Sequence, residues 1–247
     1  MLVERIPVVI IQTPNSERFR PLVETIGKSE LFEIILVVAT MGHSLVISDD
    51  RFVQEEVYKY GRELTQNERA CAVSHSRGRE IIAKSKQGGI IFEDDARVIN
   101  LEYLEEVTAA FLTKSTHASS ILGLLHYSER IVVGSACDSP LKFRRLFAEI
   151  PLAVASVLTP RAARELLDSS ALASQIADWP KSKCRFYVLS TGCVRHGDAT
   201  SGTVIGDTTK RINLKTSYPI SIKGISYTMH RFLQKLDTFL IHYFQSR

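Results

Sequence analysis

Three consecutive carboxylates, Glu93, Asp94 and Asp95, directly follow an apolar run from Ile90 to Phe92 that is typical of a buried strand. Such side chains repel one another and add nothing to a core, so another group is expected to offset the repulsion. They stand at the carboxyl end of the strand, where open α/β sheets bind ligands. Because alternate side chains of an extended segment share a face, Glu93 and Asp95 are expected to point together and Asp94 away. Two convergent carboxylates suit Mg²⁺ or Mn²⁺ completed by a substrate diphosphate and water, whereas the alternative is an acidic loop that caps the following helix.

Strands and helices alternate along the chain, which predicts α/β layers around a mainly parallel sheet. The run at 32–39 does not alternate in polarity, so we expect a strand buried on both faces. Thr65 and Glu68 have the spacing of a capping box that opens a long helix. Ser16 is expected to cap an earlier helix, and Arg18 in the same turn is placed to meet a diphosphate or, alternatively, solvent. The expected strands are 7–11, 32–39, 90–92, 120–127, 153–158 and one within 184–196, and the expected helices are 16–27, 54–61, 66–86, 101–113 and 160–172.

The composition is that of a globular protein, since 45% of the 247 residues are hydrophobic and 23% are charged. These values exclude a disordered or fibrous chain, and the apolar runs are far shorter than the roughly 20 residues of a membrane-spanning helix. No secretory signal is expected at the start of the sequence. Four cysteines without metal-binding or disulfide spacing predict free thiols, mostly buried, in a reducing, cytoplasmic setting: Cys71, Cys137, Cys184 and Cys193.

Positive charge is concentrated in the last part of the sequence. The segment from residue 204 onward contains seven lysines and arginines but only two aspartates, so it accounts for the whole net charge of +4. Within 224–247 the apolar residues recur every three or four positions, which predicts an amphipathic helix. The helix either docks on the preceding domain or lies in the interface of an anionic membrane, and we favour peripheral membrane association. Residues 1–203 are expected to form one folded domain and residues 204–247 a basic segment, and we expect no nucleic-acid partner.

Two blocks carry a resemblance to a known family. The run from Glu63 to His75 (ELTQNERACAVSH), followed by a helix and then by IIFEDDA from Ile90 to Ala96, resembles the family 25 glycosyltransferases. These include bacterial galactosyltransferases of lipooligosaccharide synthesis and the collagen galactosyltransferases. Weaker matches lie at Ser16-Glu17-Arg18, at 154–167 and at Asp178-Trp179-Pro180, so the resemblance covers roughly residues 6–203. The chain departs from the family pattern at residues 10–12 and 38–41.

The resemblance implies that residues 1–203 are the catalytic domain, folded as a single-domain, nucleotide-sugar-binding (GT-A-like) sandwich. It implies an inverting transfer of a hexose, galactose first, from a UDP-sugar to a lipopolysaccharide or another cell-surface glycan. Asp95 would hold Mn²⁺ or Mg²⁺, while Glu93 or Asp94 would contact the ribose or the metal and its waters. His196 falls where many metal-dependent glycosyltransferases place a third metal ligand. The Ser74–His75 pair would stand beside the donor, although a histidine that only ties the helix to the sheet is the alternative.

Inversion also needs a base that removes the proton of the acceptor hydroxyl. Asp178 is the first candidate and Glu149 a weaker one, with Trp179 as a platform on which the acceptor sugar stacks. In the alternative, Asp178 caps a turn and Trp179 fills a core. Two other functions remain open on the sequence: a catalytically silent protein that binds a sugar nucleotide or glycan, and a metal-dependent pyrophosphate or phosphodiester hydrolase.

Overall fold

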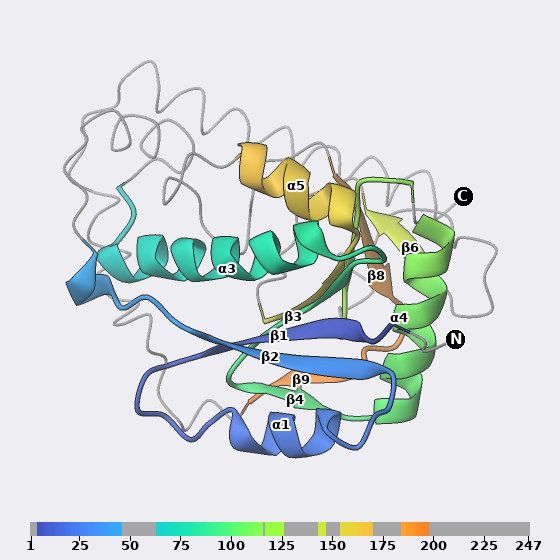
Figure 1. Cartoon of the computed structure of the whole chain (residues 1–247), viewed down its shortest axis with the longest axis horizontal. Helices are drawn as coiled ribbons and strands as arrows, with labels where there is room; N and C mark the ends of the chain where they lie inside the picture. Colours follow the sequence, from blue (N-terminus) through green and yellow to red (C-terminus); the bar gives the residue numbers. More distant parts are fainter. Residues whose placement is uncertain are drawn as a thin grey trace, which may run out of the picture.

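Nine strands and five helical segments lie in the parts of the chain that the structure, a computed structural model, describes: residues 4–45, 63–115, 117–125, 143–146, 154–169 and 184–197 (Figure 1). The strands are β1 (Ile6–Gln12), β2 (Phe32–Val38), β3 (Gly89–Glu93), β4 (Ala96–Val98), β5 (Ser120–Gly123), β6 (Phe143–Leu146), β7 (Ala155–Leu158), β8 (Arg185–Leu189) and β9 (Val194–His196). The helices are α1 (Arg20–Ile26), the single-turn η1 (Gly42–Ser44), α3 (Gln66–Lys84), α4 (Leu101–Ser115) and α5 (Pro160–Ser169).

A seven-stranded sheet in the order β2-β1-β3-β7-β5-β8-β6 forms the centre of the described fold, and β4 pairs with β9 in a separate two-stranded sheet. β1 lies parallel to both β2 and β3, and β5 lies parallel to β8. β7 runs antiparallel to both of its neighbours, and β6 runs antiparallel to β8. Five of the seven strands therefore point the same way. The predicted α/β fold with a mostly parallel sheet is confirmed. The reversed direction of β7 and β6 was not predicted from the sequence.

Helices cover both faces of this sheet, and the alternation of side chains along β1 separates the two cores. Val8 and Ile10 belong to the core beneath α1 and α4, whereas Val9 and Ile11 belong to the core beneath α3 and α5. Figure 1 shows α3 and α5 together on one side of the sheet and α1 on the opposite side. Because every one of these β1 side chains is buried, the first strand is apolar throughout, as a two-sided parallel strand must be.

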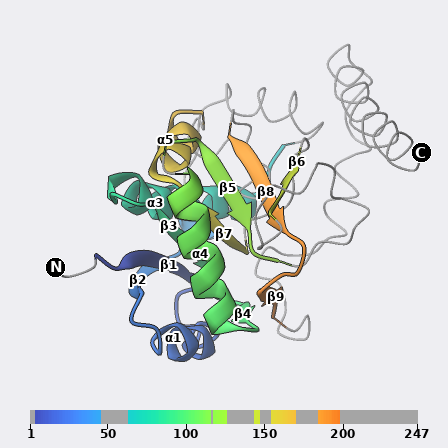
Figure 2. The same cartoon turned by 90° about the vertical axis from the view of Figure 1, so that its right-hand side faces the viewer.

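Aromatic contacts join α4 to β6 and β8, and Figure 2 shows the course of this helix in front of the sheet. The ring of Phe111 meets the rings of Phe143 on β6 and Tyr187 on β8 edge-on, with centroids 5.8 and 5.7 Å apart. Edge-to-face pairs of this kind add about 0.5–1.5 kcal/mol each beyond the burial of their area. Phe111 therefore packs against two neighbouring strands, β6 and β8, that are distant in sequence.

The long helix α3 begins where the sequence predicted. Thr65 is its N-cap: its Oγ1 accepts a hydrogen bond from the backbone N–H of Glu68 (3.2 Å), and the Glu68 carboxylate accepts from the backbone N–H of Thr65 (2.9 Å). The helix then passes unusually close to the sheet at Gly78, where a Cβ would lie 3.2 Å from Val9 and 3.3 Å from Ile91. The capping box therefore sets the start of α3, and the glycine sets its distance from β1 and β3.

Two local predictions were wrong. Helix α1 begins at Arg20 with Phe19 as its N-cap residue, and not at Ser16, whose Oγ accepts from the backbone of Arg18 instead. A proline near the start of α1 favours the observed first turn because its fixed φ suits that position. The strand at 32–38 is not buried on both faces, since Leu36 is 47% exposed and Val38 is 54% exposed. It is the last strand on its side of the described sheet, so only part of its surface is covered.

Other predictions fall outside the described residues. These are the helix at 54–61 and the basic segment 204–247 with its amphipathic helix. In the described part of the chain, no helix has the length and apolarity that a membrane crossing requires. The short strands β4, β6 and β9 were not predicted separately, because three or four residues carry too little periodicity to be recognised.

The turn between α3 and β3 requires a glycine, and Gly88→Ala should destabilise the protein. Gly88 has φ +109°, and a Cβ there would lie 2.5 Å from the carbonyl oxygen of Leu158 and 2.7 Å from a methyl of Leu112. We expect a loss of about 1–3 kcal/mol in the free energy of unfolding, measured by urea denaturation. Lys86→Ala in the same turn is the control, because that side chain is 83% exposed and its loss should cost less than about 0.5 kcal/mol. Equal denaturation midpoints for the two variants would contradict the strain argument.

Candidate active site

A pocket lies at the carboxyl ends of β1 and β3, roofed by the first half of α3 and by the segment after β2. Nine residues were singled out from the sequence as site residues, and seven of them lie in the described part of the chain. All seven line this pocket: Arg18, Ser74, His75, Glu93, Asp94, Asp95 and His196. Asp178 and Trp179, as well as the alternative base Glu149, lie outside the described residues. The structure therefore brings together residues from four separate stretches of sequence.

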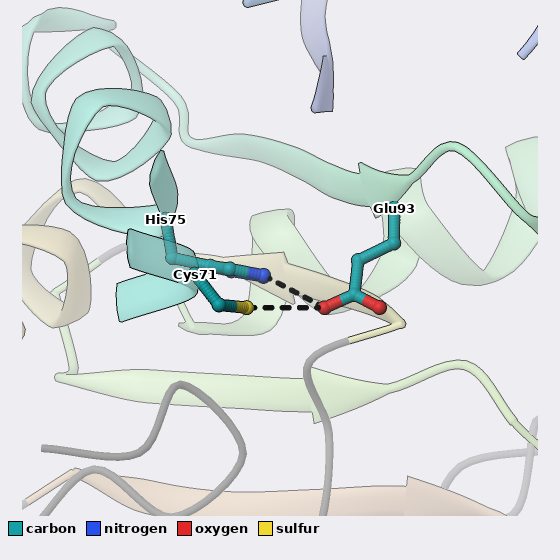
Figure 3. Close-up of side chains that lie close together, drawn as sticks. All are labelled: Cys71, His75 and Glu93. Carbon is teal, nitrogen blue, oxygen red and sulfur yellow. Dashed lines mark hydrogen bonds and ion pairs between the residues drawn. The ribbon is translucent and has the colours of Figure 1, made fainter. Parts of the chain in front are cut away.

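Glu93, the last residue of β3, turns toward α3. Its Oε1 lies 3.0 Å from Nε2 of His75 and 3.8 Å from Sγ of Cys71, so both α3 side chains point at one carboxylate oxygen (Figure 3). Burial alone would raise the pKa of Glu93, but the hydrogen bond and charge of His75, together with the charge of His196, outweigh it. The pKa of Glu93 consequently lies below its ordinary value, and the residue is ionised at neutral pH.

Asp94 and Asp95 form a turn between β3 and β4, so the chain is not extended there. Arg18 reaches both: its Nη2 donates to Oδ2 of Asp95 (2.9 Å), and its Nε lies 4.0 Å from Oδ1 of Asp94. The backbone N–H of Thr13, just beyond β1, donates to Oδ2 of Asp94 (3.1 Å). The prediction that Asp94 points away from its neighbours was wrong, because the turn removes the alternation on which it rested.

Of the three acids, Asp95 is the one whose burial and charge are least offset by neighbouring groups. Nδ1 of His196 lies 3.5 Å from its Oδ2, while its Oδ1 is buried and accepts no hydrogen bond from any residue that the structure describes. Burial raises the pKa of Asp95, the charges of Glu93 and Asp94 raise it further, and His196 and Arg18 oppose this only in part. A buried carboxylate oxygen without a donor is costly unless another group pairs with it.

The β4–β9 pairing places His196 beside the acidic turn. Ala96 pairs with His196 in the antiparallel register, which brings the end of β9 against the start of β4. At the next residue, Gly197, a Cβ would lie only 2.5 Å from the carbonyl oxygen of Asp95. The glycine therefore permits the two backbones to approach closely enough for the imidazole to reach Asp95.

The donor set and the charge of the pocket fit a divalent cation. Three carboxylates among the described lining residues face one guanidinium, so negative charge is in excess whenever the two imidazoles are neutral. Carboxylate oxygens with an imidazole are ligands that Mn²⁺ accepts, and carboxylates with water suit Mg²⁺. The Oδ1 of Asp95, which accepts no hydrogen bond from the described residues, offers one coordination position directly.

Ser74 holds the roof of the pocket in place. Its Oγ donates to the carbonyl of Ala70 within α3 and accepts from the backbone N–H of Thr40 (2.8 Å), which ties the segment after β2 to the helix. Gly42 lies so close to Asn67 that a Cβ would meet its side-chain oxygen. Residues 39–42 therefore line the pocket even though this stretch departs from the expected family pattern.

Cys71 was not among the site residues predicted from the sequence. It was predicted to be a buried apolar thiol, whereas it is only partly buried and lines the pocket. Its position four residues before His75 puts both side chains on one face of a helix, which is a signal that the sequence does contain. The remaining partner, Glu93, is supplied by a strand, and helical spacing cannot reveal that.

Comparison with known proteins supports a family assignment. No curated protein matches the chain. Among solved structures, the crystal structure of A197 from STIV is 12% identical with a TM-score of 0.40, and the alignment covers 79% of this chain and 86% of that chain. A family model described as glycosyltransferase family 25 (LPS biosynthesis protein) matches residues 47–178, which is more than half of the sequence and includes α3 and the acidic turn. The chain therefore belongs to glycosyltransferase family 25 and is a glycosyltransferase.

Proposed function

We propose that the protein transfers a hexose, galactose first among the candidates, from a UDP-sugar to a glycan acceptor of lipopolysaccharide, with inversion and with the help of Mn²⁺ or Mg²⁺. Membership of the family supports sugar transfer, with a sugar donor and a glycan acceptor as partners. The observation that carries metal dependence is the buried Oδ1 of Asp95, which has no hydrogen-bond donor among the described residues. Family membership also favours transfer over the silent binding protein and the hydrolase that the sequence left open.

The negative charge of the pocket supports a role for a cation in donor binding. The diphosphate of a UDP-sugar is anionic, and Glu93, Asp94 and Asp95 would repel it with only Arg18 as a permanent positive charge among the described lining residues. Asp95, His196 and Glu93 would hold the divalent ion. When bound, that ion neutralises the charge that develops on the leaving diphosphate, a form of electrostatic stabilisation that is often the largest catalytic contribution.

The protein's own residues orient the other groups. Arg18 contacts Asp94 and Asp95 at the pocket wall, where its guanidinium is within the same cavity as the expected diphosphate and can pair with phosphate oxygens. His75 holds the Glu93 carboxylate in its ionised form, and Ser74 holds the roof of the pocket. Glu93 or Asp94 would then accept hydrogen bonds from the ribose or from metal-bound water.

In the transfer itself, the oxygen of an acceptor hydroxyl attacks the anomeric carbon from the face opposite the diphosphate. The bond between the anomeric carbon and the β-phosphate oxygen breaks, and its electron pair leaves with UDP. Asp178 takes the hydroxyl proton as general base, and Trp179 stacks against the acceptor sugar. Binding of the basic segment 204–247 to the anionic inner leaflet of the cell membrane, next to a lipid-linked acceptor, remains a prediction from the sequence.

Asp95→Asn should abolish most of the transfer activity. The amide removes the charge that would bind the cation, so we expect turnover to fall by about 10²–10³-fold with little change in folding. The assay follows UDP release from a panel of UDP-sugars with Mn²⁺, with and without acceptor glycans, alongside thermal denaturation. Asp168→Asn on the exposed face of α5 is the matched control and should retain full activity. Near-normal turnover of Asp95→Asn would refute the role of this residue, and release of UDP without acceptor would indicate a hydrolase.

His196→Ala should weaken the use of metal more than it slows the chemistry. Removal of one ligand is expected to raise the Mn²⁺ concentration needed for half-maximal activity by more than about tenfold, whereas activity at saturating Mn²⁺ recovers largely. Titration of activity against Mn²⁺ measures this shift. His117→Ala provides the control, since His117 is exposed and does not line the pocket. An unchanged Mn²⁺ dependence would remove His196 from the ligand set.

Asp178→Asn should separate catalysis from donor binding. If Asp178 is the base, turnover falls by about 10²–10⁴-fold while the affinity for the UDP-sugar stays nearly unchanged. Calorimetric titration of the donor with Mn²⁺ measures that affinity. A loss of donor binding in this variant would instead assign Asp178 to the donor site.

A further inference from the structure

Three side chains with different metal-binding atoms converge on one point at the edge of the pocket. Cys71, His75 and Glu93 point toward one another (Figure 3), and their ligand atoms Sγ, Nε2 and a carboxylate oxygen all lie within 4.8 Å of one another. Two of the three separations are 3.0 Å (His75 to Glu93) and 3.8 Å (Cys71 to Glu93). Ligands at roughly 2.0–2.3 Å from a tetrahedral ion stand about 3.3–3.6 Å apart, so these separations bracket the required geometry.

The fold supports this cluster on rigid elements. Cys71 and His75 are four residues apart on α3 and therefore lie on the same helical face, while Glu93 ends a central strand. Gly78 holds the helix against that strand. His75 is 3% exposed and Glu93 retains a 20% exposed side chain, so the cluster is sheltered on the protein side and open toward the pocket.

The chemistry of the three atoms differs from that of the Asp95 site. A thiolate, an imidazole and a carboxylate form a borderline-soft donor set, which Zn²⁺ favours and which Mg²⁺ and Mn²⁺ do not select. The protein supplies three ligands, and the pocket supplies room for water or another group in a fourth position. Binding would release the Cys71 thiol proton to solvent, because the thiolate is the ligand form.

We propose that Cys71, His75 and Glu93 form a second cation site that binds Zn²⁺ and that shares only Glu93 with the divalent cation site at Asp95. This inference does not depend on the transfer reaction, because the cluster is defined by its own geometry and its occupancy is measured without donor or acceptor.

Cobalt provides the test, because Co²⁺ bound by a thiolate gives a charge-transfer absorption that carboxylate sites lack. The full-length protein titrated with Co²⁺ should show this band, and one equivalent of Zn²⁺ should abolish it. Cys71→Ser should lose the band, and His75→Gln should weaken Co²⁺ binding by more than about tenfold. Cys193→Ala and Asp95→Asn should keep the band: burial raises the pKa of Cys193 to about 12, and Asp95 belongs to the other site.

A second measurement uses the unaltered protein, so that it does not depend on whether a variant folds. Iodoacetamide alkylates accessible thiols, and mass spectrometry locates the modified cysteine. Zn²⁺ should slow alkylation of Cys71 by more than about tenfold, whereas Mg²⁺ should have no effect. Absence of the cobalt band in the unaltered protein, its persistence in Cys71→Ser, or alkylation of Cys71 that is insensitive to Zn²⁺ would each overturn the proposal.

Discussion

The mutual repulsion of three consecutive carboxylates is the constraint around which this site is built. Glu93 ends β3, which lies between β1 and β7 in the sheet, and Asp94 and Asp95 follow it directly. Because the three residues are consecutive, the backbone keeps their carboxylates close together. The groups that offset their charge come from other elements: Arg18 from the turn after β1, His75 from α3 and His196 from β9. Each of these elements must approach the end of β3 closely, and glycines at the helix–sheet contact and at the end of β9 make that approach sterically possible.

The surroundings of Glu93 and Asp95 shift the pKa values of these two acids in opposite directions. The pKa of Glu93 is lowered because His75 hydrogen-bonds to its ionised form and outweighs its burial, whereas the pKa of Asp95 is raised by burial and by the charges of the two acids before it. Active sites are enriched in titratable groups whose pKa values are shifted apart in this way. Among the described residues no group pairs with the buried Oδ1 of Asp95, and this is where we propose that a divalent cation binds.

The end of β3 lies between two sets of potential metal ligands, one at the acidic turn and one on α3. Toward the turn, aspartate oxygens and an exposed imidazole make a hard, oxygen-rich set beside Arg18. Toward α3, the Glu93 carboxylate meets a thiol and a buried imidazole on one helical face. Because cations are sorted by the softness of their ligands, we propose that these two sides of one pocket bind different ions. Glu93 is the residue that connects them.

Much of the architecture was predictable from local patterns in the sequence. The capping box at Thr65 set the start of α3, the apolar runs located β1 and β3, and the acidic triplet marked the strand end at which ligands bind. Seven residues picked from the sequence line the pocket, although what each of them does stays a prediction. Local patterns could not predict that β7 and β6 run against the other strands, that Val38 is exposed, that Asp94 faces the pocket or that Cys71 lies at Glu93. Periodicity describes the chain over a few residues, whereas strand direction and the pairing of Arg18 with Asp95, 77 positions later, follow from the packing of distant segments, which only the tertiary structure decides.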